Sequence, residues 1–157
     1  MTLFPEPVES VYCRMRHEFA ETDTESEALL VVTFAGGRTG ICDLSGLATI
    51  SKPRFYARGT RATFQKYGLD PQETAMIAGD INTARELSEN FGILRYNDGT
   101  EQAVPTLSGR WRSFYENVAD ALLRGAELGV KPEQVRRSIA VLDAARQSAA
   151  GNRVISW

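Results

Sequence analysis

The chain has 157 residues, of which 43% are hydrophobic and 24% charged, and its formal net charge is −2. This length and composition predict one globular domain that can form a core without disulfides or metal ions. The near balance of charge argues against a general attraction to nucleic acid. No apolar run approaches the roughly 18 residues of a membrane span, and the N-terminus lacks the features of a signal peptide, so we expect a cytoplasmic protein.

Few residues can support the common kinds of catalytic chemistry. The chain contains two cysteines and one histidine, which are too few for a zinc framework or a histidine-rich metal site. We predict that Cys13 and Cys42 are core thiols and that His17 is a hydrogen-bonded residue on the apolar face of a strand. The sequence also lacks a glycine-rich turn for a dinucleotide and a phosphate-binding loop.

The first part of the chain predicts strands joined by short turns. The first strand alternates between apolar and polar residues, and the second is a continuous apolar run typical of a covered central strand. Gly36 and Gly37 predict a tight turn after the second strand. Short connections of this kind indicate a mostly antiparallel, open sheet. The predicted strands are residues 11–19, 27–34, 38–44, 54–58 and 61–65.

The second part of the chain predicts helices that pack on one face of this sheet, which makes the fold class α+β. Pro71 follows Asp70 and marks the start of the first helix. Apolar residues at helical spacing predict two amphipathic helices near the C-terminus. The sequence Asn-Asp-Gly-Thr at residues 97–100 predicts a small hairpin. One predicted helix begins after Pro71, and the others are residues 82–90, 111–122 and 132–151.

Residues 52–73 form the most distinctive segment, because basic and aromatic side chains are interleaved there. No acidic residue occurs between Leu44 and Leu69. Such a pattern resembles a platform for single-stranded nucleic acid. However, the segment lacks the motif of the commonest such module, and strand alternation would send half of these side chains to the opposite face. We therefore expect no nucleic-acid partner.

Residues 53–73, PRFYARGTRATFQKYGLDPQE, resemble the region after the main strands in the C-terminal domain of the Gfo/Idh/MocA oxidoreductases. Three further segments agree with this family in the same order. They are its first strand, its hairpin and its closing helices, which correspond to residues 6–12, 34–40 and 111–134. One departure is Lys131, where the family often has a serine or threonine that caps the last helix. The resemblance covers nearly the whole chain.

The resemblance implies that the cofactor and the catalytic groups belong to another domain. In this family a Rossmann domain binds NAD or NADP and supplies the lysine of a Glu-Lys-Pro motif, and an Asp-x-x-x-His helix completes the proton-transfer group. Here Lys52 and Lys131 precede proline without a preceding glutamate, and His17 has Cys13 four residues before it. We therefore expect residues 1–157 to be a single C-terminal substrate and oligomerisation domain, without a Rossmann domain, catalytic residue, cofactor or metal site.

The full-length protein implied by the resemblance is an NAD(P)-dependent sugar or polyol dehydrogenase, and this chain alone is expected to be inactive. Its candidate substrate contacts are Lys66, Tyr67 and Gln72, which lie where the sheet gives way to helix and offer ammonium, hydroxyl and amide groups suited to polyols. The alternative is a stand-alone module that binds an anionic ligand or assembles with a partner, without redox activity.

The expected partners are a Rossmann domain, a sugar or polyol, and further copies of this chain. A sheet that is covered by helices on one side leaves the other side open to solvent or to a partner. We therefore predict a homo-oligomer that forms through the open face of the sheet. The strand residues that could serve this contact are Tyr12, Arg14, Arg16 and Asp43.

Overall fold

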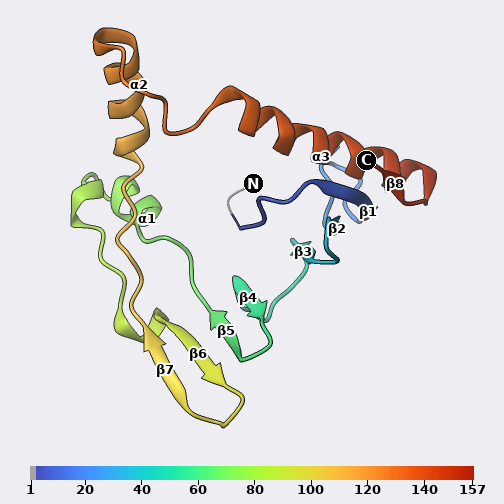
Figure 1. Cartoon of the computed structure of the whole chain (residues 1–157), viewed down its shortest axis with the longest axis horizontal. Coiled ribbons are helices and arrows are strands. Elements are labelled where there is room, and N and C mark those ends of the chain that lie inside the picture. Colours follow the sequence, from blue (N-terminus) through green and yellow to red (C-terminus); the bar gives the residue numbers. More distant parts are fainter. Residues whose placement is uncertain (1–2) are drawn as a thin grey trace. The chain divides into compact units, whose positions relative to one another are not determined.

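The computed structural model describes residues 3–157, and the chain divides into two compact units (Figure 1). The first unit is Met1–Thr49 together with Val130–Trp157. The second unit is Ile50–Gly129. Each unit contains one antiparallel sheet of four strands, so the two units can be compared element by element.

The sheet of the first unit has the strand order β3-β2-β1-β8. Its central register pairs Val11 of β1 with Val32 of β2, and Val32 with Gly40 of β3. Gly36 and Gly37 both have positive φ angles, so the predicted glycine turn between β2 and β3 is confirmed. The strands are β1 (Val8–Arg16), β2 (Glu27–Phe34), β3 (Thr39–Ser45) and β8 (Ile155–Ser156).

Helix α3 (Pro132–Gly151) packs on one face of this sheet, over β1 and β8. The alternation of β1 directs its apolar side chains toward the helix, where small alanines allow a close approach. The core consists entirely of apolar residues and one cysteine. Its buried members are Val8, Val11, Cys13, Val32, Phe34, Val141, Ala144 and Ala145.

One polar side chain, Ser148 of α3, is fully buried beside this core. Strand β8 pairs only with Ser10 and Val11, so the edge of β1 has no strand partner beyond that point. The backbone N–H of Cys13 donates instead to the Ser148 hydroxyl at 2.8 Å, and this hydroxyl donates to the carbonyl of Arg153 at 2.7 Å. Ser148 thus replaces a missing strand partner.

The sheet of the second unit has the strand order β4-β5-β6-β7. Phe64 of β5 lies over Gly92 of β6, where an added Cβ would approach the Phe64 ring to 2.3 Å. The strands are β4 (Phe55–Arg58), β5 (Ala62–Lys66), β6 (Gly92–Tyr96) and β7 (Glu101–Val104). The helices are α1 (Gln72–Ile77), the short 3₁₀ turns η1 (Ile81–Thr83) and η2 (Ser88–Asn90), and α2 (Arg112–Arg124).

The α+β class with antiparallel strands is confirmed, and the strands fall into two sheets. The helix predicted over residues 82–90 was wrong, because this segment contains only η1 and η2. The Asp80 carboxylate accepts the backbone N–H of Asn82 at 2.9 Å, and such side-chain bonds favour turns over continued helix.

Two core assignments were also wrong. Cys42 is exposed on β3, because α3 covers β1 and leaves this edge strand largely open. His17 follows the end of β1 and is exposed. Cys13 is buried as predicted, and burial, with a smaller contribution from the charge of Glu25, raises the pKa of its thiol. It is therefore protonated at neutral pH.

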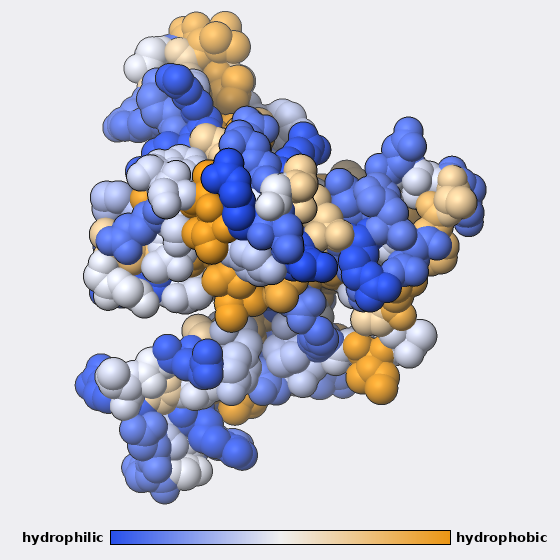
Figure 2. All heavy atoms as spheres, turned by 90° about the vertical axis from the view of Figure 1, so that its right-hand side faces the viewer, coloured by the Kyte–Doolittle hydropathy of each residue, from blue (hydrophilic) through white to orange (hydrophobic). Residues whose placement is uncertain are grey.

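Apolar side chains are also abundant on the surface, as the orange atoms among blue ones in Figure 2 show. In α2, the side chains of Tyr115, Leu122 and Leu123 are all at least 70% exposed. No helix within residues 3–157 combines the length and the apolar character that are needed to cross a membrane.

Candidate functional site

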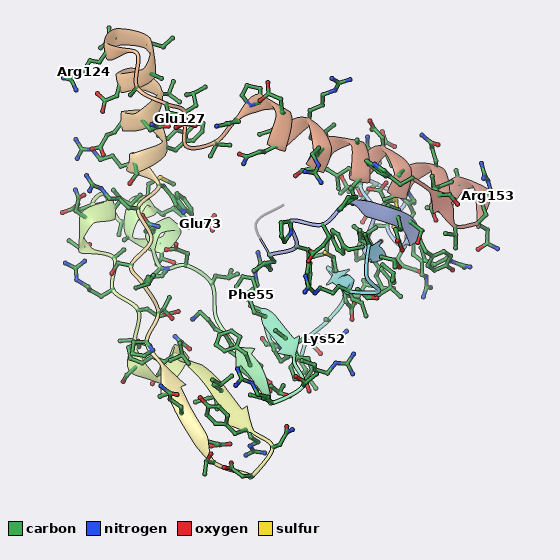
Figure 3. The ribbon with its side chains drawn as sticks, in the orientation of Figure 1. Lys52, Phe55, Glu73, Arg124, Glu127 and Arg153 are labelled. Carbon is green, nitrogen blue, oxygen red and sulfur yellow. The ribbon has the colours of Figure 1, made fainter. Side chains whose placement is uncertain are left out.

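The second unit contains a cavity of about 500 Å³. Four parts of the chain line it: the strands β4 and β5 where Phe55 and Lys66 pair, the turn into α1, the loop of residues 84–91, and the extended segment of residues 106–109. Figure 3 labels Phe55 at the start of β4 and Glu73 in α1, so the chain between them can be followed there. Much of this lining belongs to the basic and aromatic segment.

Lys66, the last residue of β5, forms a nearly buried ion pair with Glu86. The Lys66 side chain is 13% exposed and the Glu86 side chain 9%. The ammonium group donates to Glu86 Oε1 at 2.5 Å, to the Asn90 carbonyl at 2.7 Å and to the Tyr67 carbonyl at 3.4 Å. All three of its N–H groups therefore have acceptors. The pair ties residues 86–90 to the sheet.

Two opposing influences set the ionisation of Glu86. Burial alone would raise the pKa of Glu86, but hydrogen bonds from Lys66 and Thr106, together with the charge of Lys66, lower this pKa below its ordinary value. Its Oε2 atom is buried, and no donor within residues 3–157 reaches it with good hydrogen-bond geometry. Glu86 is therefore a carboxylate at neutral pH, and its charge is compensated mainly by Lys66.

A second polar arrangement, the Gln72 clamp, holds another part of the cavity wall and consists of Asp70, Gln72, Gly109 and Trp111. Gln72 is only 3% exposed. Its backbone and side-chain N–H groups each donate to the Asp70 carboxylate at 2.9 Å. Its side-chain oxygen accepts the backbone N–H of Trp111 at 3.0 Å. A Cβ at position 109 would lie 2.1 Å from Asp70 Oδ2 and from Gln72 Nε2, so the clamp requires glycine there.

Two arginines that line the cavity carry uncompensated positive charge. Arg54 is exposed, and no carboxylate within residues 3–157 pairs with it. Arg85 donates to the carbonyls of Asn82 and Ala84 at 3.0 and 2.6 Å, which are neutral acceptors. Because Lys66 is paired with Glu86, the net positive charge of the lining comes from Arg54 and Arg85, and the one remaining carboxylate there, within residues 3–157, is that of Asp70.

The structure brings two of the three predicted substrate contacts together. Lys66 and Gln72 both line the cavity, whereas Tyr67 is not among its lining residues and is 43% exposed. The polar atoms of Lys66 and Gln72 already have partners within the chain, so these side chains shape the walls. Within residues 3–157, no group of three His, Cys, Asp or Glu side chains could hold a metal ion.

Four residues of the site had not been predicted: Arg54, Arg85, Glu86 and Gly109. Arg54 belongs to the basic and aromatic segment, and that pattern could have identified it. Glu86 lies 20 positions after Lys66 in a polar stretch that the sequence analysis had assigned to a helix. Gly109 contributes by having no side chain, and a single sequence does not distinguish such a glycine from one in an ordinary loop.

The C-terminal alpha/beta domain of the Gfo/Idh/MocA oxidoreductase family matches residues 1–156. The chain therefore belongs to this family and represents its C-terminal domain. The fold agrees with this assignment. The solved structure of yvaA from Bacillus subtilis superimposes with a TM-score of 0.89 at 24% identity, and the match covers 99% of this chain and 47% of that one.

Two sequence relatives agree with the family assignment. The scyllo-inositol 2-dehydrogenase (NADP⁺) IolW of Bacillus subtilis is 31% identical over 110 residues, which are 66% of this chain and 31% of IolW. The uncharacterised oxidoreductase YhhX of Escherichia coli is 28% identical over 164 residues, which are 98% of this chain and 46% of YhhX. The chain thus spans less than half the length of each relative.

Proposed function

We propose that this domain supplies part of the substrate site of an NAD(P)-dependent oxidoreductase that acts on a sugar or polyol. In this proposal a separate domain binds NAD or NADP and supplies the catalytic groups, so residues 1–157 form a single non-catalytic domain. The name of IolW, which specifies an inositol and NADP⁺, supports both the substrate class and the cofactor. Hydride would pass between the nicotinamide and a carbon that bears a hydroxyl group.

The cavity of the second unit is the observation on which this proposal depends. Its volume of about 500 Å³ is within the range of small-molecule sites. The Lys66–Glu86 pair and the Gln72 clamp fix two parts of its wall, and fixed walls reduce the ordering cost of binding. Phe55 and Phe91 offer apolar surface, and Thr106 offers a hydroxyl. This mixture suits the apolar faces and hydroxyl groups of a polyol.

A ligand titration tests this function directly. In the Trp157→Phe variant, Trp111 of the Gln72 clamp is the sole tryptophan, and its backbone N–H is bonded to Gln72, which lines the cavity. We expect a saturable fluorescence change with sugars or inositols and none with NADPH, and no alcohol oxidation by the chain alone. Stoichiometric NADPH binding, or turnover without added protein, would overturn the proposal. The absence of a response to any sugar or polyol would also overturn it.

We also propose that the chain forms a homo-oligomer through the face of the first sheet opposite α3. On this face Tyr12, Val31 and Ile41 lie side by side across β1, β2 and β3. The next row carries Arg14 on β1 and Asp43 on β3. A two-fold axis through β2 would bring the basic edge of one copy against the acidic edge of the other, which gives complementary charge around an apolar centre.

Sedimentation of two matched variants tests this interface. Ile41 and Leu44 lie on opposite faces of β3 and are 59% and 57% exposed. We expect Ile41→Asp to dissociate the oligomer, because it buries a carboxylate in the proposed contact, and Leu44→Asp to leave it intact. A monomeric wild-type chain at high concentration, or equal effects of the two variants, would contradict the interface.

A further inference from the structure

We propose that the ligand of the cavity is a polyol that carries a carboxylate or a phosphate group, recognised by Arg54 and Arg85. This inference rests on the proposed function and narrows its substrate class. It follows from the charged residues that line the cavity. Lys66 and Glu86 are paired with each other, whereas Arg54 and Arg85 have no carboxylate partner within residues 3–157.

Charges in the walls are compensated or held by internal hydrogen bonds. Lys66 and Glu86 pair with each other and are about nine-tenths buried. The Asp70 carboxylate accepts two N–H groups from Gln72. All three N–H groups of Lys66 have acceptors within the chain, and the Gln72 amide is uncharged and only 3% exposed. Recognition of a ligand charge must therefore come from other residues.

Arg54 and Arg85 are exposed and have no carboxylate partner within residues 3–157. A guanidinium group presents a planar set of donors that matches the two oxygens of a carboxylate or phosphate. Outside the Lys66–Glu86 pair, Asp70 is the one carboxylate in the described part of the chain that lines the cavity, so the two arginines leave the lining with a net positive charge. Two such arginines at one cavity select a ligand with a negatively charged group.

The size and the remaining lining of the cavity indicate more than a bare anion. A cavity of about 500 Å³ is far larger than an inorganic phosphate ion and is typical of an organic ligand. Hydroxyl groups of Thr106 and Ser108 and the ring of Phe55 also line it. These groups can contact the hydroxyls and carbon skeleton of a sugar while the arginines hold its charged end.

Three sugars with the same carbon skeleton distinguish a neutral ligand from one with a carboxylate and one with a phosphate. Glucose, glucuronate and glucose 6-phosphate are titrated into the Trp157→Phe chain, with inorganic phosphate as a fourth probe. We expect at least one of the two charged sugars to bind about tenfold more tightly than glucose, as for a charge-assisted hydrogen bond that is partly exposed. Arg54→Gln and Arg85→Gln should each remove most of this preference.

Arg58→Gln is the matched control, because Arg58 is exposed, lies on the same strand as Phe55 and does not line the cavity. It should leave the preference unchanged. Glucose binding as tightly as both charged sugars would overturn this inference and leave the proposed function intact. Inorganic phosphate binding as tightly as glucose 6-phosphate would overturn the requirement for a polyol. No binding of any sugar would overturn both proposals.

Discussion

The two units of the chain are built on different interactions. All of the buried hydrophobic side chains belong to the first unit, where α3 covers β1 and β8. In residues 50–129, the one buried side chain is polar, that of Gln72, and the Lys66–Glu86 pair is nearly buried. The first unit thus has a buried apolar core, whereas the second combines polar contacts with apolar side chains that are only partly buried, such as Phe64 and Phe91.

The cavity lies in the second unit, which is the unit without a buried apolar core. Apolar packing is dense and leaves little room for a ligand. Hydrogen bonds between side chains can instead fix the relative positions of separate segments without filling the space between them, because each bond has a preferred length and angle. The cavity is lined by separate segments of this kind. Lys66 connects β5 to Asn90, and Gln72 connects α1 to Trp111. We therefore assign stability mainly to the first unit and propose ligand binding for the second.

Phe34→Ala should have the largest effect on stability. Phe34 is 3% exposed and its ring lies 4.8 Å from that of Phe4. Truncating a buried phenylalanine costs about 3 to 5 kcal/mol, and urea unfolding will measure it. Leu44→Ala on the same sheet, where the side chain is 57% exposed, should cost less than about 1 kcal/mol. Equal losses would contradict the assignment of the core.

Lys66→Met should destabilise the second unit by about 3 kcal/mol, because it leaves the Glu86 carboxylate buried without its partner. The double variant Lys66→Met/Glu86→Gln should recover much of this loss, since the unpaired charge is gone. Urea unfolding of the single and double variants gives the coupling energy of the pair. Additive effects would show that the two side chains do not interact.

Much of this architecture could be predicted from the sequence, because it depends on local patterns. Alternation identified the strand that became β1, and Gly36 and Gly37 identified the turn between β2 and β3. The polar clamps could not be predicted, since they join residues that are far apart: Gln72 and Trp111 are separated by 39 positions. Strand β8 has only two residues, which is too short for an apolar period to appear.

Gly109→Ala should have an intermediate effect of about 1 to 2 kcal/mol, because the added methyl group would displace Asp70 or Gln72. It should also change the fluorescence of Trp111 in the Trp157→Phe background. Gly59→Ala is the control in the same unit, since an added Cβ there meets its nearest neighbour at an ordinary 3.4 Å. If both variants behave alike, the close packing at position 109 is not required.

Acid should have the smallest effect and should act on the second unit. The pKa of Glu86 is lower in the folded protein than its ordinary value. Its stabilising contribution is therefore complete above the unfolded pKa, and it is lost as the pH falls through the folded pKa. The protection of residues 86–90 from hydrogen exchange, taken relative to the intrinsic exchange rate at each pH, should fall as the pH drops below about 4, the ordinary range of a glutamate pKa. The Glu86→Gln variant should lack this loss of protection, and an unchanged protection profile in the wild-type chain would refute the role of Glu86.

Hydrogen exchange of the wild-type chain, with and without a bound sugar or polyol, tests the division between the units most directly. Without ligand, β1, β2 and α3 should exchange most slowly. Ligand should slow exchange in residues 66–72, 84–91 and 106–111 and leave the first unit unchanged. Ligand-dependent protection confined to β1, β2 or α3 would contradict the account, because binding would then occur at the unit that we assign to stability.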